Sequence, residues 1–213
     1  MIESMYRQTV RGIVRAAVAC LGGMTVEGAE RVPASGGVLI TPNHVSHLDP
    51  PVVGVCLKRP AWFLATDELF SIPVLGHMAR WLRAYPIRQD SPDREALRKT
   101  ERLLEAGEIV VAFPEGHESL DGRLQPLQRG IVWIALRTGV PVVPVGIRGT
   151  NLMLPPREWR LRHAGQRMHV CFGLPISPDE LAGDRTGQDR VVHGCDVLRR
   201  SLLRLTGYDE RIP

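Results

Sequence analysis

Two residues suited to proton transfer, His44 and Asp49, lie five positions apart in the segment PNHVSHLDP (42–50). This segment directly follows the apolar run GVLIT (37–41), and functional groups often gather where a strand of an α/β sheet ends. A histidine with a pKa near neutrality can take a proton from a hydroxyl. A carboxylate on the other ring nitrogen orients the ring and stabilises the imidazolium. The spacing therefore favours a His44–Asp49 pair, although Asp49, followed by two prolines, also suits a helix N-cap.

The same segment allows two other kinds of site. His44, His47 and Asp49 are possible ligands of a metal-dependent hydrolase, but the common motifs space their histidines differently and no second histidine motif follows. A serine hydrolase of the usual α/β type needs a G-x-S-x-G turn, which the chain lacks. We therefore expect a site without a metal, and keep the hydrolase as the less favoured alternative.

Further polar residues follow later apolar runs. FPEGHES (113–119) turns through Gly116, where backbone amides can face a ligand. Arg123 and Arg129 come near the start of the next predicted helix, and arginines at a helix N-terminus suit a phosphate. Arg88 follows a shorter apolar run. Taken singly, each arginine could equally be a solvated surface charge.

Short β-rich apolar runs alternate with helical patterns along the chain, which predicts a single α/β domain with a mixed, mostly parallel sheet flanked by helices. The predicted strands are 37–41, 62–65, 108–113 and 141–147, with 24–30 and 168–173 as further candidates. The predicted helices are 92–106, 129–138 and 188–205, the first of them capped by the sequence Ser91-Pro92-Asp93. Residues 151–166 are expected to be irregular and 182–189 a polar loop. Because proline cannot donate to a ladder, the strand VPVVPV (140–145) is expected at an edge or at a bulge.

Residues 2–21 have apolar side chains at helical spacing, and Arg7, Arg11 and Arg15 recur every fourth residue on a different face. Gly22 and Gly23 end this pattern. A basic amphipathic helix can lie in a membrane interface with its arginines toward lipid headgroups. It can equally pack on its own domain with a solvated arginine stripe.

Composition narrows the class of protein only slightly. The net charge of +4 allows an anionic partner without selecting one. The four cysteines have mostly apolar neighbours and no C-x-x-C spacing, which predicts reduced core cysteines in a cytosolic protein. No apolar run is long enough to span a bilayer and no signal-peptide layout is present, so we expect the chain on the cytoplasmic side.

Taken together, N-H-x-S-x-x-D, an arginine motif, F-P-E-G and V-P-V-V-P-V, in this order and spacing, resemble the glycerolipid acyltransferases, in particular the bacterial 1-acylglycerol-3-phosphate acyltransferases. The resemblance covers about residues 25–175 and includes a linker-like segment at 68–76. It implies peripheral or monotopic attachment to the inner membrane, through residues 1–23, of an acyltransferase domain at 24–213. It also implies an acyl-CoA or acyl-carrier-protein donor and direct transfer to a lysophospholipid-like acceptor. Neither a bound cofactor nor nucleic acid is expected.

By this resemblance His44 is the general base and Asp49 its partner. The remaining expected substrate-site residues are Asn43 and Ser46, which shape the turn, Arg88 as the acceptor-phosphate arginine, Glu115 and Gly116 of the third motif, and Arg123 and Arg129.

Two cationic positions of the family are replaced in this chain. The third motif usually continues Thr-Arg-Ser but here reads His117-Glu118-Ser119, and Thr66 stands where the linker often has a lysine. A carboxylate facing a phosphate dianion would cost affinity. We therefore predict that the acceptor is not ordinary lysophosphatidate, or that Arg88, Arg123 and Arg129 hold its phosphate instead. A lipid-binding protein of the same fold without turnover is the alternative from another functional class.

Overall fold

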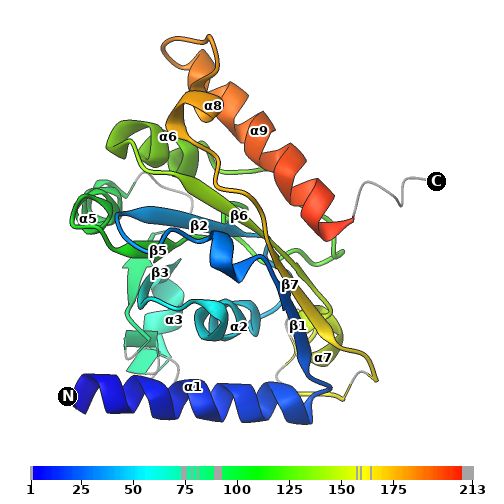
Figure 1. The fold of residues 1–213 in the computed structure, drawn as a ribbon. Coiled ribbons are helices and arrows are strands. Elements are labelled where there is room, and N and C mark those ends of the chain that lie inside the picture. The colour runs from blue at the N-terminus through cyan, green and yellow to red at the C-terminus, as the bar shows by residue number, and fades with distance from the viewer. Residues whose placement is uncertain are drawn as a thin grey trace.

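The computed structural model describes residues 2–72, 76–77, 79–80, 82–88, 93–156, 158, 160–163 and 165–207, with the side chains of α1 described at residue 9 and from residue 11 onward. A seven-stranded sheet in the order β1-β7-β6-β2-β5-β3-β4 forms its centre (Figure 1). Its neighbours are parallel except for the pair β6 and β7, so β1 and β7 run against the other five. The strands are β1 (Met24–Glu27), β2 (Val38–Pro42), β3 (Ala61–Thr66), β4 (Ala84–Ile87), β5 (Ile109–Val111), β6 (Val142–Arg148) and β7 (Met168–Phe172).

The helices include several short ones. They are α1 (Ile2–Cys20), the 3-10 helix η1 (Ala29–Arg31), α2 (Asp49–Cys56), α3 (Asp67–Ser71), α5 (Arg94–Glu105), α6 (Arg129–Thr138), α7 (Thr150–Met153), α8 (Pro178–Ala182) and α9 (Asp189–Thr206). The predicted fold class, a mixed and mostly parallel sheet flanked by helices, is confirmed. β4, α3, α7 and α8 were not predicted, because each is too short to establish a periodic pattern. The predicted strand 24–30 ends at Glu27, where Gly28 in a left-handed conformation starts η1.

The strand around 140–145 was expected at an edge of the sheet or at a bulge. The expectation of an edge strand is wrong, because β6 lies in the interior of the sheet between β2 and β7. Its other expected feature, a bulge, is present. Val145 pairs with Phe172 and Val142 bridges Ile176, so two residues of β6 stand opposite three of the partner chain. Pro144 lies in this interrupted stretch, and its carbonyl accepts from Gly173 N. The missing N–H of Pro144 is therefore tolerated inside the sheet.

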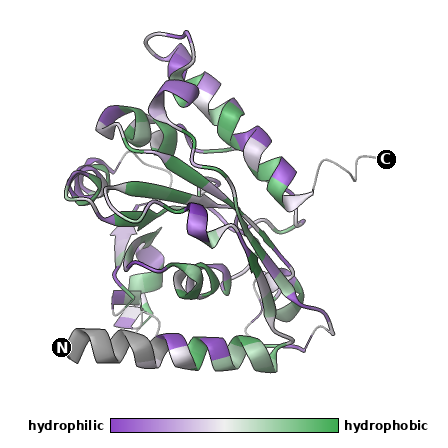
Figure 2. Ribbon diagram, in the orientation of Figure 1, coloured by the Kyte–Doolittle hydropathy of each residue, from purple (hydrophilic) through white to green (hydrophobic). Residues whose placement is uncertain are grey.

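The alternation of side chains along the strands divides the core into two clusters, one on each face of the sheet. Leu39, Val110 and Val142 pack with helices α5, α6 and α9, whereas Ile40, Val111 and Val143 face the side of α1 and α2. Figure 2 shows the resulting concentration of hydrophobic residues in the central strands. Since both faces are covered, the central strands are apolar throughout, as β2 shows with all five residues buried.

The N-terminal helix α1 packs beneath α2 (Figure 1). Val18 is buried in the core, and Arg11 donates to the carbonyls of Val55 and Leu57 at 3.1 and 2.7 Å. Arg15 reaches the Val55 carbonyl at 3.4 Å. These carbonyls form the C-terminal end of α2, where a cation is favourable. Of the two alternatives left open by the sequence, Arg11 thus follows the one in which the helix packs on its own domain, whereas Arg15 stays exposed.

Two local predictions also need correction. α5 begins at Arg94, and Asp93 is its N-cap, accepting from the amides of Glu95 and Ala96, while Ser91 and Pro92 lie outside the described residues. The cysteines are free, as expected, but they are not core residues: Cys20 is exposed and the other three are only partly buried.

Candidate functional site

The carboxyl ends of β2, β5 and β6 meet at one edge of the sheet, where open α/β folds place their ligands. His44 follows β2, the segment 112–119 follows β5, and Thr150 follows β6. Residues far apart in sequence therefore converge on one place, and the predicted pair lies at its centre.

His44 and Asp49 form the predicted contact. Nδ1 of His44 lies 2.9 Å from Oδ2 of Asp49. The imidazole stacks on Phe113 with ring centroids 4.1 Å apart, and its side chain is only 16% exposed. Because Nδ1 is occupied by the carboxylate, Nε2 is the nitrogen left to exchange a proton with a substrate.

Asp49 is fully buried and held by four donors. Besides His44, its Oδ2 accepts from the amides of Val45 and Ser46 at 2.7 and 2.8 Å, and its Oδ1 accepts from Thr150 Oγ1 at 2.6 Å. The N-cap of α2 is Leu48, so Asp49 is the first helical residue and does not cap its own helix. A buried carboxylate bound by this many donors is rigidly positioned, which a residue orienting a general base requires.

Glu115 joins the first and third sequence blocks. Its Oε1 accepts from the backbone N–H of His44 at 2.6 Å, and its Oε2 accepts from Gln125 N at 2.7 Å. Burial raises the pKa of Glu115 to about 7, against the opposing effect of these two donors. Ser119 N also donates to the His44 carbonyl at 2.8 Å. The predicted substrate-site residue Glu115 thus holds the loop that carries His44 in place through the backbone of that loop.

Asn43 and Ser46 are also buried and engaged within the protein. The amide of Asn43 exchanges two hydrogen bonds with Ile147, from Ile147 N at 2.6 Å and to Ile147 O at 3.0 Å. Ser46 Oγ donates to the Leu154 carbonyl at 2.7 Å. Both side chains shape the turn after β2, and Gly116, with φ at +80°, makes the corresponding turn after β5.

A second histidine–carboxylate pair borders Nε2 of His44. Oε1 of Glu118 lies 2.5 Å from Nδ1 of His47 and 3.8 Å from Nε2 of His44. The contact with Glu118 raises the pKa of His47, outweighing the opposite effect of burial. The carboxylate at the replaced position of the third motif thus lies near both histidines.

The three predicted arginines are not drawn into this network. Arg88 pairs with the helix cap Asp93 at 3.4 Å and its side chain is 64% exposed. No hydrogen bond or ion pair joins the side chains of Arg88, Arg123 or Arg129 to His44, Asp49 or Glu115 among the described residues. Their role toward a phosphate stays a prediction.

The proposed metal ligands do not converge on one point. His47 faces Glu118, whereas the Oδ2 of Asp49 is occupied by His44 and two backbone amides. In the part of the chain that the structure describes, no group of three or more His, Cys, Asp or Glu side chains could hold a metal ion.

Sequence reasoning missed Thr150, the fourth partner of Asp49, and the contact between His47 and Glu118. Thr150 lies 101 positions from Asp49 and has no local signal, since a threonine after a strand is commonplace. His47 was noted only as a possible metal ligand. Only the register of β2 against β6 brings Thr150 to Asp49.

Comparison with known proteins identifies relatives of the chain. The family model described as Acyltransferase matches residues 23–148. A 1-acyl-sn-glycerol-3-phosphate acyltransferase of Bacillus subtilis is 30% identical over 185 residues, covering 86% of this chain and 88% of that protein. The chloroplastic enzyme BAT2 of Brassica napus, of the same name, is 33% identical over 163 residues, covering 75% of this chain.

The overlap with these relatives differs in extent. This chain spans 47% of the Brassica napus protein and 42% of a similar chloroplastic protein of Arabidopsis thaliana. Among solved structures, the 1-acyl-sn-glycerophosphate acyltransferase PlsC of Thermotoga maritima superposes with a TM-score of 0.76 at 26% identity, covering 95% of this chain and 80% of that one.

Proposed function

Since the chain belongs to the acyltransferase family, we propose that it transfers a fatty acyl group from a thioester to a hydroxyl of a lysophospholipid-like acceptor. The family resemblance inferred from the four sequence blocks is confirmed, and an O-acyltransferase is the class to which the named relatives belong. The observation that carries the proposal is the contact between His44 Nδ1 and Asp49 Oδ2 at 2.9 Å, at the carboxyl edge of the sheet.

In the proposed reaction, the acceptor hydroxyl gives its proton to Nε2 of His44 while its oxygen attacks the thioester carbonyl carbon. The carbon–sulfur bond then breaks, and the leaving thiolate takes up the proton from the imidazolium. Asp49 keeps the proton of the neutral ring on Nδ1 and stabilises the charged ring that forms. The acyl group passes directly to the acceptor, and the scheme needs neither a metal nor a bound cofactor. Acyl-CoA and acyl-carrier protein are the donors we propose.

During the proposed reaction, negative charge develops on the thioester carbonyl oxygen. Backbone amides that stabilise this oxyanion must not already donate to another acceptor. Those of His44, Val45, Ser46 and Ser119 are already engaged. The tight turn after Gly116 presents the N–H of His117, which bonds no acceptor within the described residues, and we propose it as a donor to the oxyanion.

Glu118 bears on the choice of acceptor. Its carboxylate is 13% exposed and borders the space in front of His44 Nε2, so a phosphate dianion at that point would be repelled. We propose an acceptor that offers a hydrogen-bond donor there, such as an ammonium group or a sugar hydroxyl. A lysophosphatidate would instead have its phosphate held away from Glu118 by Arg88, Arg123 and Arg129.

Membrane attachment is proposed from the outward face of α1. That face carries no charged side chain at six exposed positions, namely Gly12, Ile13, Ala16, Ala17, Ala19 and Cys20. Ile13 is 64% exposed, while Arg11 turns inward to α2. Among the described residues, no helix is both long and apolar enough to cross a bilayer. A helix lying in the interface of the inner membrane, on the cytoplasmic side, fits this arrangement.

The decisive experiment is product analysis by mass spectrometry. The full chain is incubated with acyl-CoA and, separately, lysophosphatidate, zwitterionic lysolipids and neutral lysolipids, and is compared with His44→Ala and with the control His193→Ala on α9. We expect wild type and control to form an acylated lipid and His44→Ala to lose activity about 10²- to 10⁴-fold.

Each of the following outcomes would contradict a different element of the proposal. A product formed equally by His44→Ala would remove His44 from its role. Clear preference for lysophosphatidate would overturn the acceptor proposed from Glu118. No free thiol with any acceptor would favour the lipid-binding alternative, and loss of activity with a chelator would favour the metal-dependent hydrolase.

A further inference from the structure

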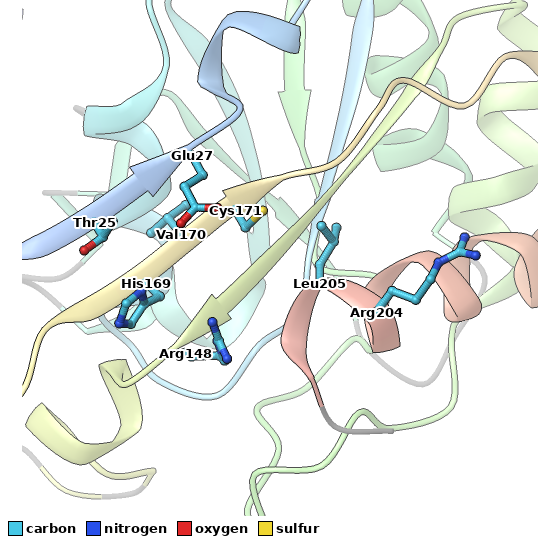
Figure 3. A pocket seen from close by; sticks show the side chains of 8 residues that line it. All are labelled: Thr25, Glu27, Arg148, His169, Val170, Cys171, Arg204 and Leu205. Carbon is cyan, nitrogen blue, oxygen red and sulfur yellow. The ribbon is translucent and has the colours of Figure 1, made fainter. Parts of the chain in front are cut away.

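A basic cavity opens at the same edge of the sheet as the catalytic pair. It measures about 590 Å³, within the range of ligand pockets, and its lining includes Arg148, Arg167 and His169. A smaller adjoining cavity of about 200 Å³ shares Arg148 and His169 (Figure 3). The function proposed above does not use these side chains.

The sheet itself places an arginine and the histidine of this lining together. Arg148 at the end of β6 is the antiparallel partner of His169 in β7, and directly opposed residues project from the same face of a sheet. Figure 3 shows both side chains in the same region, between β7 and the end of α9. Arg167 immediately precedes β7, and its backbone carbonyl lies close against Gly149. Two guanidinium groups and one imidazole therefore line the same cavity.

Within the described residues, one carboxylate, that of Asp121, lines the larger cavity beside these groups. Neither Arg148 nor Arg167 forms a side-chain hydrogen bond or ion pair there. The Oδ1 of Asp121 accepts from Ser119 Oγ, Arg123 N and Gln125 Nε2, so this carboxylate keeps its charge but binds its own loop, and two guanidinium groups face it in the larger cavity. Glu27 lines only the smaller cavity. The larger cavity thus has an excess of positive charge and available guanidinium donors, which suits phosphate groups.

The walls of the cavity connect it to the catalytic pair. Asn151 and Leu152 line it and directly follow Thr150, whose hydroxyl holds Asp49. Asp121 and Gly122 also line it and follow shortly after Ser119, whose amide donates to the His44 carbonyl. The cavity therefore lies beside the site, yet His44 and Asp49 do not line it.

We propose that this cavity binds the phosphate groups of the acyl donor, those of coenzyme A or of a phosphopantetheine arm. The inference rests on the acyl transfer proposed above. In such donors a long pantetheine chain separates the phosphates from the thioester, so their phosphates must bind away from the reacting carbon. An acceptor phosphate lies much nearer the reacting hydroxyl and would have to fit beside Glu118.

The test compares Arg148→Gln and Arg167→Gln with the control Arg200→Gln, an exposed arginine on α9 outside the cavity. Each is assayed with an acyl-CoA and with the matching acyl-pantetheine, which lacks the phosphates. We expect each cavity variant to raise KM for acyl-CoA about tenfold, the effect of losing one charge-assisted hydrogen bond. KM for acyl-pantetheine, KM for the acceptor and melting temperature should stay at the wild-type values.

If the cavity variants raise KM for acyl-CoA and KM for acyl-pantetheine equally, the proposal is wrong. A rise in KM for lysophosphatidate, with none for a monoacylglycerol, would assign the cavity to the acceptor phosphate instead. Calorimetric titration with coenzyme A alone separates this inference from the proposed function. If coenzyme A binding is weakened in Arg148→Gln, the cavity binds the donor phosphates even if no acyl transfer occurs. If acyl transfer occurs and coenzyme A binding is unchanged in both variants, the proposed role of the cavity is wrong and the proposed function still holds.

Discussion

Asp49 shows how a single buried carboxylate can organise a site made from distant parts of the chain. Its donors come from His44, two backbone amides of the preceding turn, and Thr150 after β6. Since these donors come from two separate segments of the chain, they fix the position of the Asp49 carboxylate beside His44.

Thr150→Val should weaken this site without changing its shape. The substitution leaves Asp49 Oδ1 buried without its hydroxyl donor, which we expect to cost about 1–3 kcal/mol of unfolding free energy and to lower kcat more than it raises KM. Urea denaturation and steady-state kinetics measure the two effects. Thr138→Val, whose hydroxyl bonds only within α6, is the control and should keep wild-type kcat. Unchanged kcat in Thr150→Val would show that Asp49 does not need this donor.

His47 and Glu118 predict a dependence of stability on pH. The folded state raises the pKa of His47 above its ordinary value of 6.5, so the protonated pair stabilises the protein fully below that value. This contribution is lost as the pH rises through the raised pKa. Glu115 acts in the same direction, because its pKa is raised to about 7, so a variant is needed to separate the two.

His47→Gln provides this separation. We expect the difference in unfolding free energy between wild type and His47→Gln to be larger at about pH 5.5 than at about pH 9. The reason is that only the wild type loses a charged pair as the pH rises from the lower to the higher value. Urea unfolding at both pH values measures the difference. An equal difference at both would mean that the pairing of His47 with Glu118 does not contribute.

At the scale of the elements, the packing of α1 shows which face of the helix meets the protein, which sequence periodicity alone leaves open. Arg11 binds the end of α2 and Val18 enters the core, whereas the uncharged stripe through Ile13 faces outward. An exposed apolar stripe on a helix whose Arg11 binds the protein differs from the usual pattern of a surface helix and fits contact with lipid.

Ile13→Asp tests this orientation. Removing the apolar side chain and adding a charge should weaken binding to phospholipid vesicles about tenfold or more, since burying one such side chain contributes about 1.5–3 kcal/mol. Co-sedimentation with vesicles measures the binding. Leu174→Asp is the matched control, because Leu174 is 72% exposed on the connection between β7 and α8. If both variants bind equally well, the outward stripe of α1 is not the attachment surface.

At the scale of the whole molecule, one glycine allows the helical layer and the sheet to meet closely. A Cβ at Gly146 in β6 would lie 2.6 Å from Leu205 Cβ and 2.7 Å from the carbonyl carbon of Leu205 in α9. The backbone of Leu205 can move away from such a Cβ only if α9 is displaced from the sheet. The close approach also keeps the end of α9 beside the basic cavity, which Thr206 lines.

Gly146→Ala should therefore destabilise the fold by about 1–3 kcal/mol, the usual cost of overpacking. Thermal or urea unfolding measures it. Gly12→Ala is the control: no atom lies within 4 Å of its added Cβ, so the better helix former should be neutral or slightly stabilising. Wild-type stability in Gly146→Ala would mean that α9 shifts on the sheet at little cost.

The fold class and the central pair could be predicted from sequence because both depend on local patterns. Apolar runs bounded by glycine and proline mark buried strands, and His44 and Asp49 belong to one turn whose geometry follows from their short separation. The order of the later motifs was also readable, because each follows the end of a predicted strand.

Other features were decided only by the tertiary structure. The interior place of β6, the contact of Thr150 with Asp49 and the joining of Glu115 to the His44 backbone depend on which strands are neighbours. The inward turn of Arg11 depends on where α1 packs, because an amphipathic pattern states that two faces differ but not which of them meets the protein. Strand order and helix docking arise from contacts between residues distant in the chain, and no local spacing records them.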